Sequence, residues 1–457
     1  MCYNEICNLS REKNMRDFLT VFRKKEGAKP IAQNNIRVPD FNDKTHELDA
    51  HTFVLYGDAS GVDFSNAGDK LPYIRFSSET KFPGADKMPK GFNPHRVLEN
   101  GKAPGLNIAN LHAMGITGKG ITVAIIDQPL NTEHIEIKDN IIHYESAGYP
   151  EHIEAQFHGT AVSSLLAGKT CGVAPDAKIV YFAANNTKKT TTLANKEFQR
   201  ILRQYFPKNI NFEETIKDIL DGRYQIDEEF RHKINKIIAT LPPDIKEQAF
   251  SVKTEIDFTH RANALRKILL MNARLPQEQK ISAVSISWGM LGTNPESKDL
   301  IRQLIESGVM VLTTDYDRFY GKVAGFLTVD RKMNSDPDDV KSYESGFWKS
   351  KIDDMNGFLL VPSGGRTIAG DTSDEDYIYC GANGGMSWST PYLVGVYALA
   401  KQIAPNLTPH RFFEIAQQTA VSNGKTGNNK IIQPQKIIQH LQHEMLLQQQ
   451  QTSGVNR

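Results

Sequence analysis

Four short runs of consecutive apolar residues, many of them β-branched, mark the middle of the chain. They cover residues 121–126, 178–183, 281–286 and 309–312. A continuous apolar run of this length is typical of a strand buried on both faces of a parallel sheet. Between these runs, residues 161–167 and 299–306 carry apolar side chains at helical spacing. The alternation predicts an α/β fold with a mostly parallel central sheet.

Residues 190–250 interrupt this alternation. Pro207 and Pro242-Pro243 punctuate three amphipathic stripes. Their apolar members are Phe198, Ile201, Leu202 and Tyr205, then Phe212, Ile216, Ile219 and Leu220, then Phe230, Ile234, Ile237, Ile238 and Leu241. The pattern predicts a mostly helical insertion that docks on the main domain. Its charged residues are interpreted as solvated helix faces, with a surface for a protein partner as the alternative.

The two ends of the chain differ in character from its middle. Residues 1–100 are broken repeatedly by Gly, Pro, Asp and Asn, which predicts an irregular or small α+β N-terminal extension, with a propeptide-like region as the alternative. Residues 101–430 form the predicted main domain. Residues 431–457 are predicted to be a C-terminal helix and a flexible tail, because a Gln run near Gln448 carries no core signal.

Composition narrows the class of protein. Among 457 residues, 54 Lys and Arg balance 53 Asp and Glu, so the net charge of +1 gives no electrostatic reason to expect nucleic acid or a membrane as partner. No run approaches the 18 or so apolar residues of a membrane span. The polar N-terminus predicts no secretory signal, and four scattered cysteines predict neither a disulfide framework nor a zinc site. We expect a cytoplasmic protein without metal or cofactor.

Three residues stand where chemistry is expected. Asp127 ends the first buried run, and carboxyl ends of parallel strands gather functional groups. His158 lies at the start of a small-residue helix, with Thr160 as a candidate N-cap. Ser387 follows two glycines and precedes an apolar helix whose N-terminus favours an oxyanion, and Pro391 is assigned to the first helical turn. Taken singly, each also has an ordinary structural interpretation: a helix cap, a buried histidine or an N-cap.

Taken together, the acid, histidine and serine occur in the order of a subtilisin triad. The surrounding motifs, over roughly residues 103–425, resemble those of the subtilisin-like serine proteases (subtilases). The motifs are His158-Gly-Thr-Ala-Val162, Gly172-Val-Ala-Pro175, Val361-Pro362 and Gly385-Met-Ser-Trp-Ser-Thr-Pro391. The order disfavours an α/β-hydrolase, in which the serine precedes the acid and the histidine.

The resemblance implies a three-layer α/β/α fold and a serine endopeptidase that acts through an acyl-enzyme. Ser387 would be the nucleophile, His158 the general base and then acid, and Asp127 the group that orients the imidazole. The segment Ser285-Ile-Ser-Trp-Gly289 is similar to the family's cleft-lining strand. Ser287, Trp288 and Gly289 would therefore contact a peptide or protein substrate, with a core aromatic as the alternative for Trp288.

Several residues depart from the family pattern. Asp127 is followed by Gln128-Pro129, and the loop over residues 169–171 is too short for the family's tight calcium site. The family's oxyanion Asn is missing, and Asp317 aligns with it, with Asp315 nearby. An ionised Asp cannot donate to an oxyanion, so we expect a slow enzyme with one of these carboxyls about 3–5 Å from the Ser387 hydroxyl. The alternative function is a catalytically impaired scaffold that binds peptides or protein partners.

Overall fold

The structure is a computed structural model of the chain. It describes residues 35–37, 54–68, 73–149, 154–193, 196–204, 211–212, 250–315, 319–345, 357–381 and 384–455. The chain divides into two compact units, of which one comprises Met1–Asn185 with His260–Arg457 and the other Asn186–Thr259.

A five-stranded sheet forms the centre of the first unit. Its strand order is β10 (Met310–Thr313), β9 (Ile281–Ile286), β4 (Thr122–Asp127), β6 (Lys178–Ala184) and β5 (Ile141–Ala147). Every neighbouring pair in this sheet is parallel. Each side chain of β4 is buried, as the continuous apolar run of that strand requires. The predicted α/β fold with a parallel central sheet is confirmed.

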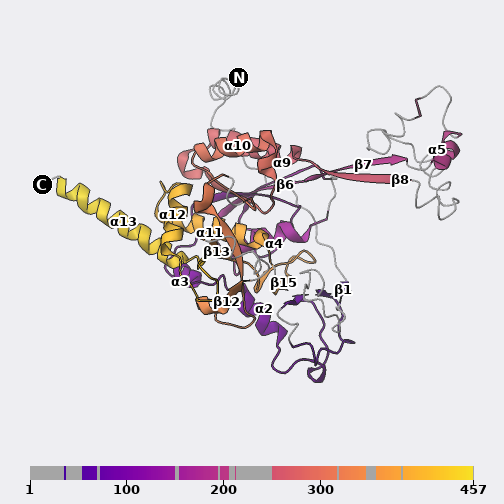
Figure 1. The fold of residues 1–457 in the computed structure, drawn as a ribbon, viewed down its shortest axis with the longest axis horizontal. Helices are drawn as coiled ribbons and strands as arrows, with labels where there is room; N and C mark the ends of the chain where they lie inside the picture. The colour runs from indigo at the N-terminus through magenta and orange to yellow at the C-terminus, as the bar shows by residue number, and fades with distance from the viewer. Residues whose placement is uncertain are drawn as a thin grey trace. The chain divides into compact units, whose positions relative to one another are not determined.

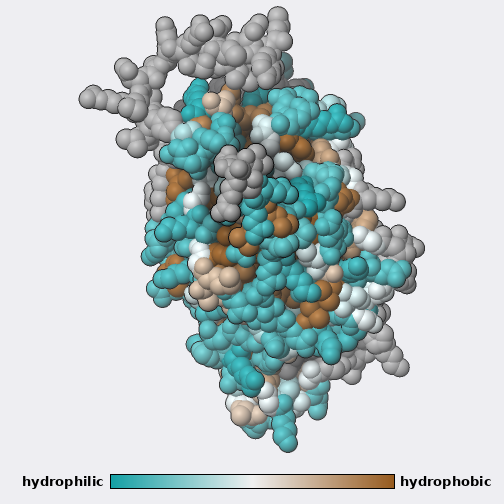
Figure 2. Space-filling view, turned by 90° about the vertical axis from the view of Figure 1, so that its left-hand side faces the viewer, coloured by the Kyte–Doolittle hydropathy of each residue, from teal (hydrophilic) through white to brown (hydrophobic). Residues whose placement is uncertain are grey.

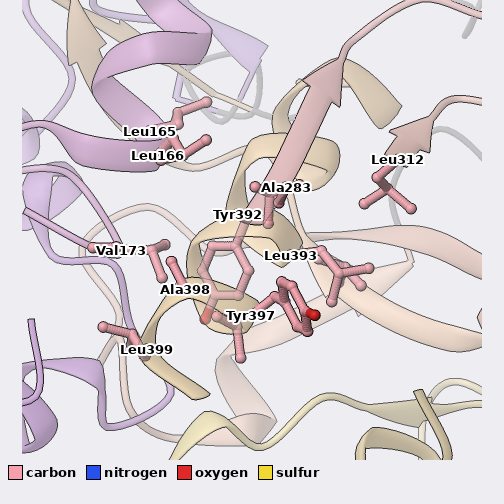
Figure 3. Packing of buried hydrophobic residues seen from close by; sticks show 14 of the residues in the cluster. Leu165, Leu166, Val173, Ala283, Leu312, Tyr392, Leu393, Tyr397, Ala398 and Leu399 are labelled. Carbon is pink, nitrogen blue, oxygen red and sulfur yellow. The ribbon is translucent and has the colours of Figure 1, made fainter. Parts of the chain in front are cut away.

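Helices cover both faces of this sheet. They are α4 (Phe157–Ala167), α9 (Thr259–Arg274), α10 (Pro295–Glu306) and α11 (Met386–Ile403). Figure 1 shows α9 and α10 on one side of the sheet and α4 and α11 on the other. Figure 3 shows Tyr392 and Leu393 of α11 packed among side chains from α4 and from strands β9 and β10. This apolar helix forms the middle of the core and holds its own N-terminus rigidly near the sheet.

The N-terminal residues share a second sheet with the main domain. The strand order is β1 (Asn35–Arg37), β2 (Val54–Tyr56), β3 (Arg75–Ser77), β15 (Tyr377–Cys380) and β14 (Arg366–Ala369). Helix α2 (Pro94–Lys102) packs against β14. Residues 54–102 are therefore built into the first unit, although the sequence predicts a separate extension over 1–100. The short strands and frequent turn residues concealed this pairing, because the partner strands lie some 300 residues later in the chain.

The remaining elements complete the first unit. A four-stranded sheet has the order β12 (Tyr343–Ser345), β11 (Phe326–Arg331), β13 (Leu359–Pro362) and β16 (Lys430–Ile431), and two further helices are α3 (Ile108–Ala113) and α12 (Pro409–Thr419). Helix α13 (Pro434–Val455) continues through the Gln run. The sequence predicts a flexible tail here, and the structure has a helix as far as Val455, because Gln is a good helix former even where no core covers it.

The second unit contains an antiparallel hairpin of β7 (Thr187–Leu193) and β8 (Phe250–Ile256), and helix α5 (Lys196–Arg203). The expectation of a mostly helical insertion missed this hairpin, since the Thr- and Lys-rich β7 has no apolar run to reveal it. Helix α5 matches the first predicted stripe. Most of the second stripe and all of the third lie outside the described residues, and docking of the insertion stays a prediction.

Figure 2 shows one face of the molecule, on which hydrophilic residues predominate and hydrophobic residues are scattered among them. Within the described ranges, no helix is both long and apolar enough to cross a membrane.

Candidate active site

Asp127 is the last residue of β4, at the carboxyl edge of the central sheet. Only 2% of its side chain is exposed. The backbone N–H of Gln128 donates to Asp127 Oδ1 over 2.8 Å. The buried carboxylate is thereby fixed at the strand end that the sequence identifies.

His158 is the second residue of α4. Its Nδ1 lies 2.7 Å from Asp127 Oδ1, and its side chain is 27% exposed. With Nδ1 engaged by a carboxylate, the neutral ring carries its proton there and leaves Nε2 as a base toward solvent. The structure therefore brings the predicted acid and histidine into direct contact.

The start of α4 is held against the turn that follows Asp127. The N–H of Gln156, the N-cap residue of the helix, donates to the carbonyl of Pro129 over 2.8 Å. Any Cβ at Gly159 would collide with the carbonyl of Gln128, so only glycine fits there. The unusual Gln-Pro sequence thus forms the surface on which the histidine helix begins. Thr160 is not the N-cap that the sequence predicts: it lies inside the helix, and its hydroxyl accepts from Asn131 N–H.

Ser387 is the second residue of α11. Gly385 precedes the helix with φ 66° and ψ 179°, a conformation that is essentially restricted to glycine. Ser363 Oγ donates to the carbonyl of Gly385 over 2.8 Å. Ser389 Oγ donates to the carbonyl of Val361 at 3.0 Å. The predicted Val-Pro motif thus anchors the segment that carries the serine.

Ser387 exchanges two hydrogen bonds with Ser287, which directly follows β9. Ser287 Oγ donates to the carbonyl of Ser387 over 2.8 Å, and Ser387 Oγ donates to the carbonyl of Ser287 over 3.2 Å. No hydrogen bond joins Ser387 to His158 among the described residues. A serine hydroxyl rotates readily about χ1, and catalytic hydrogen bonds are often absent without substrate.

Pro391 is the sixth residue of α11 and therefore lies inside the helix, not in the first turn as the sequence predicts. It has no N–H to donate to the carbonyl four residues earlier, which is that of Ser387. The hydroxyl of Ser287 supplies this hydrogen bond instead.

Trp388 connects the serine segment to the histidine. Its ring centroid lies 5.4 Å from that of His158 and 5.8 Å from that of Phe157. The guanidinium carbon of Arg75, in β3, lies over the Phe157 ring, 4.9 Å from its centroid. Only 3% of Trp388 is exposed, so it fixes the imidazole by packing. Sequence analysis missed these contacts; the Trp that directly follows Ser387 was the available signal.

The predicted cleft residues lie at the same edge of the sheet. Ser287 is buried, whereas Trp288 and Gly289 are half-buried. A Cβ added at Gly289 would lie 2.9 Å from Asp315 Oδ1, so this carboxyl faces the cleft-lining segment. Asp317 lies outside the described residues. The expected approach of the Asp315 or Asp317 carboxyl to the Ser387 hydroxyl stays a prediction.

A buried arginine that the sequence analysis did not identify lies under Trp288. The guanidinium carbon of Arg261, in α9, is 4.4 Å from the Trp288 ring centroid. Burial lowers the pKa of Arg261, and the charge of Asp127 opposes that shift. Burial also raises the pKa of nearby Tyr149 to about 12. In the described part of the chain, no cluster of His, Cys, Asp and Glu could hold a metal ion.

Comparison with known proteins agrees with this geometry. The sequence profile of the Subtilase family matches residues 118–211, which include Asp127 and His158. Over this segment the chain is similar to the subtilase family.

The chain is also similar to curated fungal proteins over a short segment. It is 35% identical over 75 residues to Subtilisin-like protease 2 of Arthroderma otae, and 32% identical over 75 residues to Subtilisin-like protease 2 of Trichophyton rubrum. Each match covers 16% of this chain, and the chain spans 18% of the length of each relative. Among solved structures, the prenylagaramide maturation protease PagA is similar with a TM-score of 0.41 and 12% identity, over 73% of this chain and 98% of that chain.

Proposed function

We propose that this protein is a serine endopeptidase that hydrolyses peptide bonds of peptide or protein substrates. The observation that carries the proposal is the 2.7 Å contact between His158 Nδ1 and the buried Asp127 carboxylate, beside the helix that begins at the Ser387 segment. A histidine held in this way is a competent general base for a neighbouring hydroxyl. The subtilase profile over residues 118–211 supports the same assignment.

In the proposed mechanism, Ser387 Oγ rotates away from the Ser287 carbonyl and transfers its proton to His158 Nε2. The hydroxyl oxygen attacks the scissile carbonyl, and the imidazolium then protonates the leaving amine. A water, deprotonated by His158, hydrolyses the acyl-enzyme and restores the serine. Asp127 stabilises the imidazolium and keeps its ring in the required orientation.

The N-terminus of α11 contributes to the proposed oxyanion site. The backbone N–H of Ser387 lies in its first turn, where N–H groups lack partners within the helix. Because the family's Asn donor is missing, this N–H carries much of the oxyanion binding, and turnover is slow. If Asp317 or Asp315 occupies the Asn position, its exchange for Asn raises turnover at neutral pH.

One observation favours a second candidate, a scaffold that binds peptides without cutting them. The hydroxyl of Ser387 donates to the Ser287 carbonyl and not to His158. A hydrolysis assay with a mixed peptide library separates the two functions. An endopeptidase yields new peptide termini that a Ser387→Ala variant does not produce, whereas a scaffold binds peptides and leaves them intact. A cytoplasmic location remains part of the proposal, and its support is the sequence alone.

A further inference from the structure

Arg261 is a buried cation with unused hydrogen-bond donors. It is the third residue of α9, and 3% of it is exposed. Neither its Nε nor its Nη1 has a hydrogen-bond partner. Buried charged groups in proteins are normally paired, because an unpaired one keeps the full cost of leaving water. A guanidinium with two unsatisfied nitrogen donors at this depth indicates a place that suits an anion.

The guanidinium contacts the segment that also holds the Ser387 hydroxyl. It stacks on Trp288 at 4.4 Å, and the preceding residue, Ser287, accepts the hydroxyl of Ser387. A ring that covers the face of a guanidinium leaves the N–H groups in its plane free to donate sideways. Two of the residues around Arg261, Trp288 and Tyr149, are only half-buried, so its surroundings extend to the surface.

Three charged or titratable groups interact electrostatically with Arg261, but none accepts a hydrogen bond from it. They are Asp127, Tyr149 and Tyr181. Asp127 attracts the guanidinium, but its Oδ1 accepts from Gln128 and contacts His158. The Tyr181 hydroxyl donates to the carbonyl of Gln128. None of these groups forms a hydrogen bond with Arg261.

We propose that Arg261 is a specificity-determining residue that binds a carboxylate of the peptide substrate at one fixed position close to the scissile bond. The inference rests on the proposed endopeptidase function. A guanidinium offers parallel N–H donors that match the two oxygens of a carboxylate. The carboxylate belongs either to an Asp or Glu side chain or to the C-terminus of a short peptide. An uncharged amide in its place would leave the buried cation unpaired, so the site discriminates against it.

A peptide series tests this proposal. A single Glu is moved along a neutral peptide, each Glu peptide is paired with its Gln counterpart, and each is made with a free or an amidated C-terminus. Wild-type kcat/KM is measured, and Kd is measured with the Ser387→Ala variant, which binds without cutting. We expect a preference of about tenfold or more for Glu over Gln at one position. If the bound carboxylate is the peptide C-terminus, peptides with a free C-terminus are preferred over amidated ones, and the Glu position has no effect.

Substitutions connect the preference to this residue. Arg261→Gln should abolish it, and Arg261→Lys, which keeps a charge without the planar fork, should retain only part of it. Arg274→Gln, at the exposed end of the same helix, is the matched control and should keep the full preference. Circular dichroism and thermal unfolding verify the fold of each variant, and the Lys variant serves if the Gln variant does not fold.

The outcomes separate this inference from the proposed function. If no peptide is cut but the Ser387→Ala variant still prefers the carboxylate, the endopeptidase assignment fails and the role of Arg261 stands. If peptides are cut with equal kcat/KM and Kd for acid and amide at every position and terminus, the Arg261 inference is overturned. It is also overturned if both Arg261 variants keep the wild-type preference.

Discussion

The hydroxyl of Ser287 donates to the backbone carbonyl of Ser387, the same carbonyl that Pro391 leaves without its helical N–H. The hydrogen bond connects the end of strand β9 to the first turn of α11 over 2.8 Å. It joins the cleft-lining segment to the proposed nucleophile. The proline inside the helix therefore has a structural partner elsewhere in the chain.

Removal of the Ser287 hydroxyl should destabilise the protein. Ser287→Ala leaves the partly buried carbonyl of Ser387 without this hydrogen bond, and we expect a loss of about 1 kcal/mol in the free energy of unfolding. Ser285→Ala is the matched control, because that hydroxyl is also buried and has no hydrogen-bond partner. Urea denaturation of both variants measures the difference. Equal stabilities for the two variants would contradict the importance of the Ser287 hydrogen bond.

Asp127→Asn should retain the fold and lose activity. The amide cannot stabilise an imidazolium and favours the wrong tautomer of His158, so we expect turnover on a peptide substrate to fall roughly 10³–10⁴-fold. Asp139→Asn changes an exposed carboxyl near the edge of the same sheet and should have no such effect. A loss of turnover below tenfold for Asp127→Asn would mean that the pair does not act as proposed.

The active protein should retain residues 54–102. Strand β3 has a neighbour on each side, since Arg75 aligns with Val54 of β2 and Ser77 with Ile378 of β15. Phe76 is fully buried, with its ring 5.6 Å from that of Tyr379. Loss of this segment would expose that core and remove Arg75 from Phe157, the residue before His158. Intact-mass analysis of active material checks the prediction, and an active species that begins after residue 102 would refute it.

Glu136 should make stability depend on acid pH. Burial alone would raise the pKa of this carboxyl, but hydrogen bonds from Thr170 and Tyr377 outweigh it, and the pKa lies below its usual 4.5. A carboxyl whose pKa is lower in the folded state than in the unfolded state stabilises the fold at pH values above its unfolded-state pKa. This contribution is lost as the pH falls through the folded-state pKa. Glu136→Gln should therefore destabilise the protein above about pH 4.5, and its deficit should shrink below that pH. Urea denaturation across pH 3–7 measures the deficit, and a deficit independent of pH would contradict this explanation.

Four of the five strands of the central sheet, β4, β6, β9 and β10, could be predicted because a local, mostly apolar run encodes each of them. Asp127 and His158 were identifiable for a similar reason, since their motifs are short and contiguous. Strand β3 was not, because its three residues pair with a segment some 300 positions away. Nothing in the sequence near Arg261 indicates that Trp288 covers it.

The hairpin of the second unit shows the same limit. Its strand β7 consists mostly of Thr and Lys, so neither an apolar run nor an alternating pattern marks it. Pairing with β8, which begins at Phe250, makes it a strand. Helix α13 is the opposite case, because its last turns follow helix propensity where the core signal is absent.

The most direct test of the account is whether Ser387 is an activated nucleophile. Purified protein is incubated with a fluorophosphonate probe, and the labelled residue is identified by peptide mass spectrometry. The proposed triad predicts labelling at Ser387 that Ser387→Ala abolishes and that His158→Ala reduces strongly. Folded protein that is never labelled at Ser387, at any pH from 5 to 9, would contradict the proposed endopeptidase and leave the peptide-binding scaffold.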